Sequence, residues 1–172
     1  MKYHMRKFRQ IRAGFTVVEL LIYMGLLSIL IVVLSQMFVT ALNVQLESQA
    51  TSSVDQDSTY VIARLSYDMQ RADQIDIPAS LGATTSELQL TIDGVSSSYQ
   101  LNNGNLAVTR SGQTTQLNGY DSQFSSLSFQ RLGNVGGENT IQVTGTVVSR
   151  TQANTLNETK DIQVTIGLRE NN

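Results

Sequence analysis

Residues 14–42 read GFTVVELLIYMGLLSILIVVLSQMFVTAL, and Glu19 is the only charged residue among them. A helix needs roughly 20 consecutive, mostly apolar residues to cross the hydrocarbon core of a bilayer. The run from Val17 to Leu42 reaches this length, although Ser28 and Gln36 make it slightly less apolar. We therefore predict a membrane-spanning helix near the N-terminus.

The charges before and after this run are opposite in sign. The chain has 12 basic and 14 acidic residues and a formal net charge of −2. Five of the bases lie in the first twelve residues, which contain no acid, so the rest of the chain carries 7 bases and 14 acids. Because Lys and Arg mark the cytoplasmic flank of a membrane span, we expect the N-terminus in the cytoplasm and the remainder outside it. The acidic remainder argues against a nucleic-acid-binding protein, whose bases would lie on the folded part.

A motif directly before the apolar run distinguishes it from an ordinary secretory signal peptide. Such a peptide ends in a small-residue cleavage site after its apolar region, and here residues 35–41, SQMFVTA, provide a poor one. Residues 13–21 read AGFTVVELL, which resembles the cleavage and methylation motif of type IV prepilins and type II secretion pseudopilins. The resemblance implies that a prepilin peptidase cuts after Gly14 and methylates the new N-terminal residue, Phe15. It also implies that Glu19 is the glutamate that pairs subunits during assembly.

The resemblance divides the chain into three parts. Residues 1–14 would be a cytoplasmic basic leader that the peptidase removes, 15–44 the transmembrane and assembly half of a helix, and 45–172 a pilin-like globular domain. The spanning helix is predicted to include Leu20, Tyr23, Leu27, Leu30 and Leu34.

Glu19 requires a physical explanation of its own. A carboxylate near the centre of a bilayer costs about 2.5–3.5 kcal/mol, so it normally has a partner or a function. No base lies between Ala13 and Leu46 to pair with it. If cleavage frees the amine of Phe15, a neighbouring subunit can offer that cation, and the pair would fix the axial stagger of packed helices. The alternative is that Glu19 lies at the headgroup level, solvated and without a role.

The helix is predicted to continue well beyond the apolar run. The only proline is Pro78, and no glycine lies between Gly25 and Gly82, so nothing forces a break between about Phe15 and Asp73. In the second half, largely apolar residues recur at spacings of three and four, which predicts a face that packs on another element. This face comprises Val54, Ser58, Val61, Leu65, Met69 and Ala72.

The opposite face of the same segment is polar. Arg64 and Asp68 lie four residues apart on it and are predicted to form an exposed ion pair, worth only about 0.2–0.5 kcal/mol. Asp68, Asp73 and Asp76 are interpreted as solvated acids at the helix end and not as the paired carboxylates of a glycosidase.

After residue 87 the spacing of apolar residues changes from about 3.6 to 2, which is typical of strands. Hairpin turns are indicated at Asp93-Gly94, at 102–105 and at Ser111-Gly112. The predicted strands are 88–92, 95–101, 106–110, 114–117, a short one around 127–129, 140–149 and 160–168, with a glycine-rich loop at 133–137. A helix followed by strands predicts an α+β fold, in which the long N-terminal helix packs on an antiparallel β-sheet.

The residue types that carry most enzyme chemistry are missing after the basic head. The only histidine is His4 and there is no cysteine, which excludes a histidine base and a thiol nucleophile in the domain. A serine nucleophile would have to use Lys160, which sits beside Asp161 in a strand pattern. The acids are too sparse for a calcium loop, and no lysine follows the 133–137 loop to hold a phosphate. We predict no enzymatic activity, no cofactor and no metal.

The resemblance implies a structural subunit of a type IV pilus or a type II secretion-like pseudopilus, and the chain's size and varied strands favour a minor one. Residues 63–72, ARLSYDMQRA, are similar to the helix end of J-type pseudopilins. The implied partners are the prepilin peptidase, other pilin or pseudopilin subunits, a membrane assembly platform and the lipid bilayer, without nucleic acid.

The implied location is the cytoplasmic (inner) membrane, crossed once with the C-terminal domain outside, and then a periplasmic or cell-surface filament. Two alternatives remain open at this point. One is a filament-tip adhesin or DNA-uptake receptor, and the other is an ectoenzyme held by a signal anchor.

Overall fold

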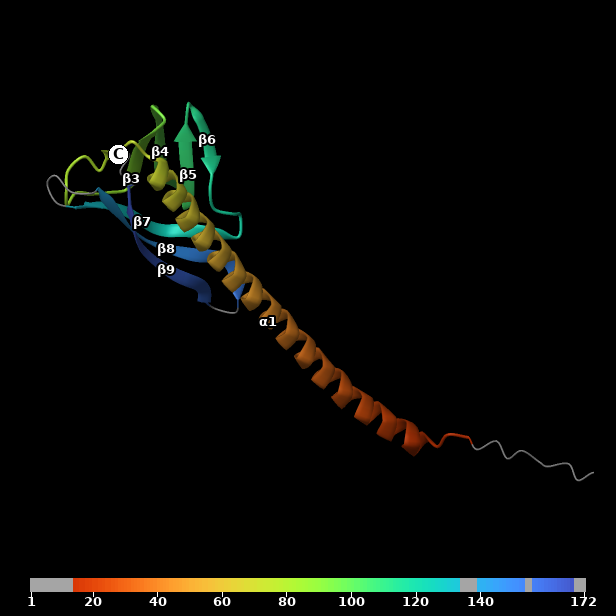
Figure 1. Cartoon of the computed structure of the whole chain (residues 1–172). Coiled ribbons are helices and arrows are strands. Elements are labelled where there is room, and N and C mark those ends of the chain that lie inside the picture. Colours follow the sequence, from red (N-terminus) through yellow and green to blue (C-terminus); the bar gives the residue numbers. More distant parts are fainter. Residues whose placement is uncertain (1–13, 134–138, 154–155, 169–172) are drawn as a thin grey trace, which may run out of the picture. The chain divides into compact units, whose positions relative to one another are not determined.

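The structure, a computed structural model, describes residues 14–133, 139–153 and 156–168. Within these ranges the chain forms a single helix, α1 (Val17–Arg71), followed by nine strands (Figure 1). The predicted α+β fold, a long N-terminal helix packed on antiparallel strands, is confirmed. Residues 1–13 of the predicted leader and 134–137 of the predicted glycine-rich loop lie outside the described residues.

The helix is one continuous element of 55 residues. It begins two residues after the predicted start, about Phe15, and ends two residues before the predicted end, about Asp73. It begins where Thr16 caps it, because Thr16 Oγ1 accepts a hydrogen bond of 3.2 Å from the N–H of Glu19. It ends in a tighter turn, in which the N–H of Ala72 donates to the carbonyl of Met69 at 3.2 Å. The chain divides into two compact units between Leu42 and Asn43, and α1 contributes to both.

The strands form two antiparallel sheets, whereas the sequence predicted one. The five-stranded sheet has the order β1-β3-β4-β5-β6 and the four-stranded sheet the order β2-β7-β8-β9. Two of the strands, β1 and β2, are only four and two residues long and were not predicted, since so short a segment shows no clear alternation. The strands are β1 (Gln74–Ile77), β2 (Thr84–Thr85), β3 (Glu87–Ile92), β4 (Val95–Asn102), β5 (Asn105–Arg110), β6 (Gln113–Gln116), β7 (Ser122–Leu132), β8 (Thr140–Ala153) and β9 (Leu156–Gly167).

The three predicted hairpin turns connect β3, β4, β5 and β6. In each turn both central residues have positive φ, as in Asn103 (48°) and Gly104 (79°). This is the type I′ geometry, whose twist matches that of the flanking strands. The turns set the register of the sheet, so that Tyr99 in β4 lies opposite Leu88 in β3 and Val108 in β5.

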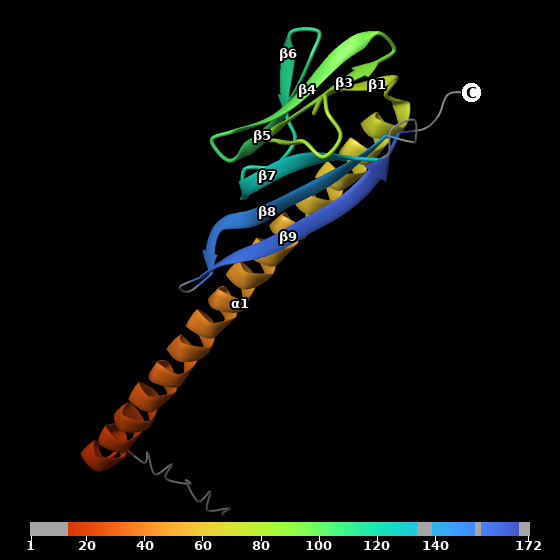
Figure 2. The same cartoon turned by 90° about the vertical axis from the view of Figure 1, so that its left-hand side faces the viewer.

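One hydrophobic core joins the second half of α1 to both sheets, and Figure 2 shows this part of the helix beside β7, β8 and β9. The predicted apolar face is confirmed, because all six of its residues are buried. An ion pair at the edge of the core links β9 to the helix, with Lys160 Nζ 2.7 Å from Asp55 Oδ1. The largest fully buried side chains are Tyr99, Phe124, Phe129, Leu65, Met69, Leu88, Leu90, Ile92, Leu106, Ile141, Val54 and Val61.

Candidate functional site

The predicted cleavage site lies immediately before α1. Gly14 and Phe15 precede the first helical residue and are exposed, and the described residues other than its chain neighbours leave open space where a side chain at Gly14 would begin. Thr16 is the N-cap of the helix, and Glu19 three residues later completes the sequence pattern of a capping box. We did not predict this cap, although the Thr-x-x-Glu spacing before an apolar run indicates it. The cap means that regular helix begins two residues after the predicted cut.

Glu19 has a neutral partner within the chain. The hydroxyl of Tyr23, one turn further on, donates to Glu19 Oε1 at 3.1 Å. The Tyr23 ring in turn meets the Phe15 ring edge to face, with the centroids 6.1 Å apart and the planes at 68°. Phe15, Glu19 and Tyr23 therefore lie together on one side of the helix start. In the described ranges no cation pairs with Glu19, so its charge is hydrogen-bonded but not neutralised.

The predicted transmembrane residues are not buried by the described part of the unit that ends at Leu42. Almost every side chain from 17 to 42 is exposed, the apolar ones included, and Glu19 is only half-buried. Among the described residues, α1 is the one helix long and apolar enough to cross a membrane. A helix that is apolar all round needs an apolar surrounding, which is either a protein interior or lipid. The exposed residues include Leu20, Tyr23, Leu27, Leu30 and Leu34.

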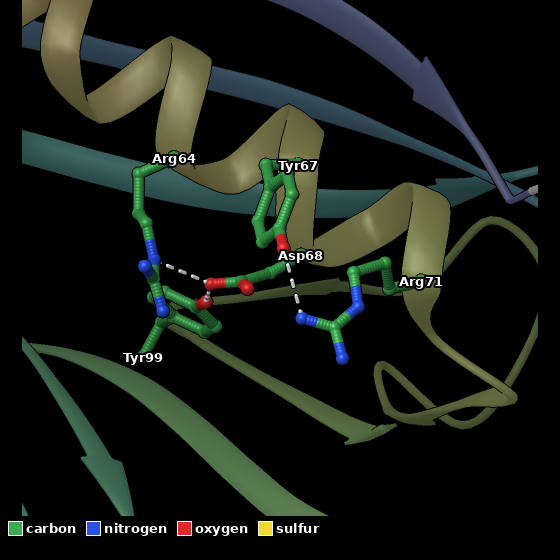
Figure 3. A network of polar contacts seen from close by, with 5 residues as sticks. All are labelled: Arg64, Tyr67, Asp68, Arg71 and Tyr99. Carbon is green, nitrogen blue, oxygen red and sulfur yellow. Dashed lines mark hydrogen bonds and ion pairs between the residues drawn. The ribbon is translucent and has the colours of Figure 1, made fainter. Parts of the chain in front are cut away.

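A second polar cluster lies between α1 and β4, around Asp68 (Figure 3). Arg64 Nε is 2.7 Å from Asp68 Oδ2, and the hydroxyl of Tyr99 donates to the same oxygen. Asp68 is only 2% exposed, so the prediction of a solvated acid in an exposed pair was wrong. Asp68 follows Leu65 by three residues, and this spacing turns it toward the buried face.

The other two acids grouped with Asp68 by the sequence lie elsewhere. Asp76 is part of β1 and accepts a hydrogen bond of 2.7 Å from Thr91, while Asp73 accepts one of 3.3 Å from the N–H of Gly94. The three carboxylates thus do not face one another across a cleft. Among the described residues no group of three His, Cys, Asp or Glu side chains could hold a metal ion.

The environment of Asp68 shifts the protonation of its two partners. Burial raises the pKa of the Tyr99 phenol above its ordinary value of about 10, and the hydrogen bond to Asp68 raises it further. For Arg64, desolvation lowers the pKa, but Asp68 and Tyr99 outweigh this and the pKa is raised. Tyr99 stays neutral and Arg64 stays charged, so Asp68 receives one neutral and one cationic donor.

The raised pKa of Tyr99 predicts a loss of stability in alkali. Tyr99 contributes its full stabilisation below about pH 10, the ordinary pKa of a phenol in the unfolded chain. This stabilisation is lost as the pH rises toward the higher pKa of the folded state. Between about pH 10 and pH 12 we expect the free energy of unfolding of the wild type to fall more steeply with pH than that of Tyr99→Phe. The difference between the two slopes should approach about 1.4 kcal/mol per pH unit. Urea unfolding of the full chain, followed by far-UV circular dichroism, measures both slopes. Equal slopes for the two proteins would contradict the assignment.

A neighbouring pair ties the end of α1 to the β3–β4 turn. Arg71 Nη1 donates to the Tyr67 hydroxyl at 3.0 Å and Nη2 is 2.6 Å from Asp93 Oδ2. The Arg71 guanidinium also lies 5.3 Å from the centroid of the Tyr67 ring, a cation–π distance. The hydrogen bond that Arg71 donates to Tyr67 is the main reason that the pKa of Arg71 is raised. All three groups are solvent-accessible, so they fix a turn and form no closed site.

Comparisons of this chain with family models, with curated proteins and with solved structures find no match.

Proposed function

We propose that this protein is a structural subunit, of the minor kind, of a type IV pilus or type II secretion-like pseudopilus. The observation that carries the proposal is the start of α1: an exposed Gly14–Phe15 bond directly before a capped helix whose first part, residues 17–42, is largely apolar on all sides and bears a single carboxylate, Glu19. A prepilin peptidase would cut this bond on the cytoplasmic side and methylate Phe15. The helix would hold the subunit in the inner membrane until assembly.

Cleavage would supply the cation that Glu19 lacks. The new amine of Phe15 on one subunit would pair with Glu19 of its neighbour, while the Tyr23 hydroxyl orients the carboxylate through its hydrogen bond of 3.1 Å. A charge pair inside an apolar helix bundle is specific because each partner is costly to leave alone. It would set the axial offset between successive subunits. The domain of residues 45–172 would then form the outer surface or the tip of the filament.

Other subunits and a membrane assembly platform are the remaining partners in this proposal. The exposed apolar residues between 17 and 42 would contact lipid before assembly and neighbouring helices afterwards. Neither partner requires a cofactor. The acidic remainder of the chain, with 7 bases and 14 acids, supports a partner other than nucleic acid.

The processing step is tested by mass spectrometry of the membrane-extracted protein from cells that contain a prepilin peptidase. We expect essentially all of the protein to begin at N-methylated Phe15. The variant Gly14→Val should retain the leader, because the peptidase of the family that the motif resembles cuts after glycine. A wild-type chain that still begins at Met1 would defeat the proposal. A chain that begins after residue 41 would instead identify an ordinary signal peptide.

A further inference from the structure

A polar hollow lies between α1 and the five-stranded sheet, apart from the helix start on which the proposed function depends. It has a volume of about 420 Å³, within the range of small-molecule sites. The helix provides one wall with Tyr60, Arg64 and Asp68, and β4, β5 and β6 provide the floor. All of these elements belong to the unit that begins at Asn43.

The register of the sheet explains why the floor is polar. Ser97 in β4 lies opposite Arg110 in β5, and Arg110 lies opposite Gln113 in β6. These three residues form a row across the strands and all line the hollow. The adjacent row toward the core is less polar, because it pairs Val108 with Thr115. The hollow thus has an apolar side and a row of polar groups.

Two buried atoms at this hollow have no partner. Asp68 Oδ1 and Ser97 Oγ are inaccessible to solvent and make no hydrogen bond within the described residues. Their side chains are 2% and 1% exposed. An unsatisfied buried polar group costs about 1–3 kcal/mol and calls for an explanation, such as a ligand. Asp68 Oδ1 can only accept, and the Ser97 hydroxyl can donate or accept.

The charges at the hollow favour an anion. Asp68 is neutralised by Arg64 at 2.7 Å, whereas Arg110 forms no ion pair with any residue of the described ranges. A guanidinium is suited to bind a carboxylate through two parallel hydrogen bonds. The ligand should therefore carry a carboxylate for Arg110 together with hydroxyl donors for Asp68 and Ser97.

The geometry points to an acidic sugar: we infer that this hollow binds a uronate-type saccharide unit. Its carboxylate would pair with Arg110, and a ring hydroxyl would bond to Gln113. Asp68 Oδ1 and Ser97 Oγ would accept or donate further hydroxyl bonds once their side chains turn toward the ligand, because both atoms are closed to solvent without it. The ring of Tyr60, which is half-exposed at the rim, offers a flat apolar face for the sugar ring. A peptide carboxylate fits less well because it brings too few hydroxyls for this row. The inference goes beyond the proposed function and does not depend on it.

Binding is tested by isothermal titration and saturation-transfer NMR on the full chain in a detergent without sugar groups. Glucuronate, glucose, acetate and glycylglycine are titrated separately. We expect glucuronate to bind most tightly. Arg110→Gln should weaken its binding about 10- to 100-fold, the effect of losing a charge-assisted pair, and should leave the weak binding of glucose unchanged.

Tyr60→Ala and Tyr67→Ala form a matched pair, because both tyrosines are about half-exposed on α1 and only Tyr60 lines the hollow. Tyr60→Ala should weaken glucuronate binding several-fold, and Tyr67→Ala should not change it. Far-UV circular dichroism checks that each variant is folded. No binding of glucuronate to the wild type would overturn the inference. So would binding that survives Arg110→Gln, tighter binding of glycylglycine, or acetate binding as tight as that of glucuronate.

Discussion

Replacing Glu19 with Ala is expected to reduce incorporation of the subunit into filaments on the order of 100-fold, while removal of the leader continues. The reduction corresponds to leaving the amine of Phe15 without its partner in an apolar bundle, a cost of about 2.5–3.5 kcal/mol. Cleavage should be largely unaffected because the cut bond lies between Gly14 and Phe15, before the helix begins at Val17.

The measurement compares sheared filaments with the membrane fraction by immunoblotting, and mass spectrometry confirms that each variant is processed. Tyr23→Phe is the matched control, because it removes the hydrogen bond to Glu19 Oε1 and keeps the charge. We expect it to reduce assembly by less than about tenfold, the value for one ordinary hydrogen bond. Normal assembly of Glu19→Ala would exclude the proposed amine pairing and would favour a solvated Glu19.

Replacing Asp68 with Ala is expected to lower the free energy of unfolding of the domain by about 2–4 kcal/mol. The Tyr99 hydroxyl, which is fully buried, would lose its acceptor at a cost of about 1–3 kcal/mol. Arg64 would lose its counter-ion, but its side chain is 36% exposed and can turn to solvent. The loss should therefore be smaller than the 3–5 kcal/mol typical of a broken, fully buried pair.

Urea unfolding of the full chain in detergent, followed by tyrosine fluorescence because the chain has no tryptophan, measures this loss. Asp93→Asn is the control, since it removes the charge of the exposed pair with Arg71, keeps a residue that tolerates the positive φ of 51° at this turn, and should change the free energy of unfolding by no more than about 1 kcal/mol. Equal effects of the two substitutions would show that the Asp68 cluster adds nothing beyond a surface ion pair.

The helix and the hairpins could be predicted because their signals are local. The absence of proline and glycine over a long segment and the spacing of Val54, Val61, Leu65 and Met69 specify a helix and its buried face. Asp-Gly, Asn-Gly and Ser-Gly pairs favour positive φ at two successive residues, which a type I′ turn needs. These features depend on neighbours a few residues away.

The division into two sheets and the burial of Asp68 could not be predicted in the same way. The order of the strands depends on which of them pair across long distances, and nothing near β2 indicates that it pairs with β7. Asp68 borders the apolar face, and its burial depends on Tyr99, 31 residues later. The polar row of Ser97, Arg110 and Gln113 likewise appears only once the register of three strands is known.

The Gly14–Phe15–Glu19 site stays a prediction from the sequence, and the contacts around it were not predicted. The motif names the residues, but the Tyr23 hydroxyl becomes a partner of Glu19 only when the helix places residues four apart on one side. Tyr23 was interpreted as one more residue of the spanning segment. Local helical geometry was sufficient to pair the two residues, so the hydrogen bond could have been anticipated.

The link between Asp55 in α1 and Lys160 in β9 also bears on the order in which the protein can fold. The two residues are 105 positions apart, and at about 5–20 residues per second a ribosome needs roughly 5–20 s to synthesise the chain between them. During that time the buried face of the helix exists without the last strands that cover it. Long-range pairing of this kind slows folding. Nascent chains therefore pass through an interval in which an apolar helix face is open to aggregation or to a chaperone.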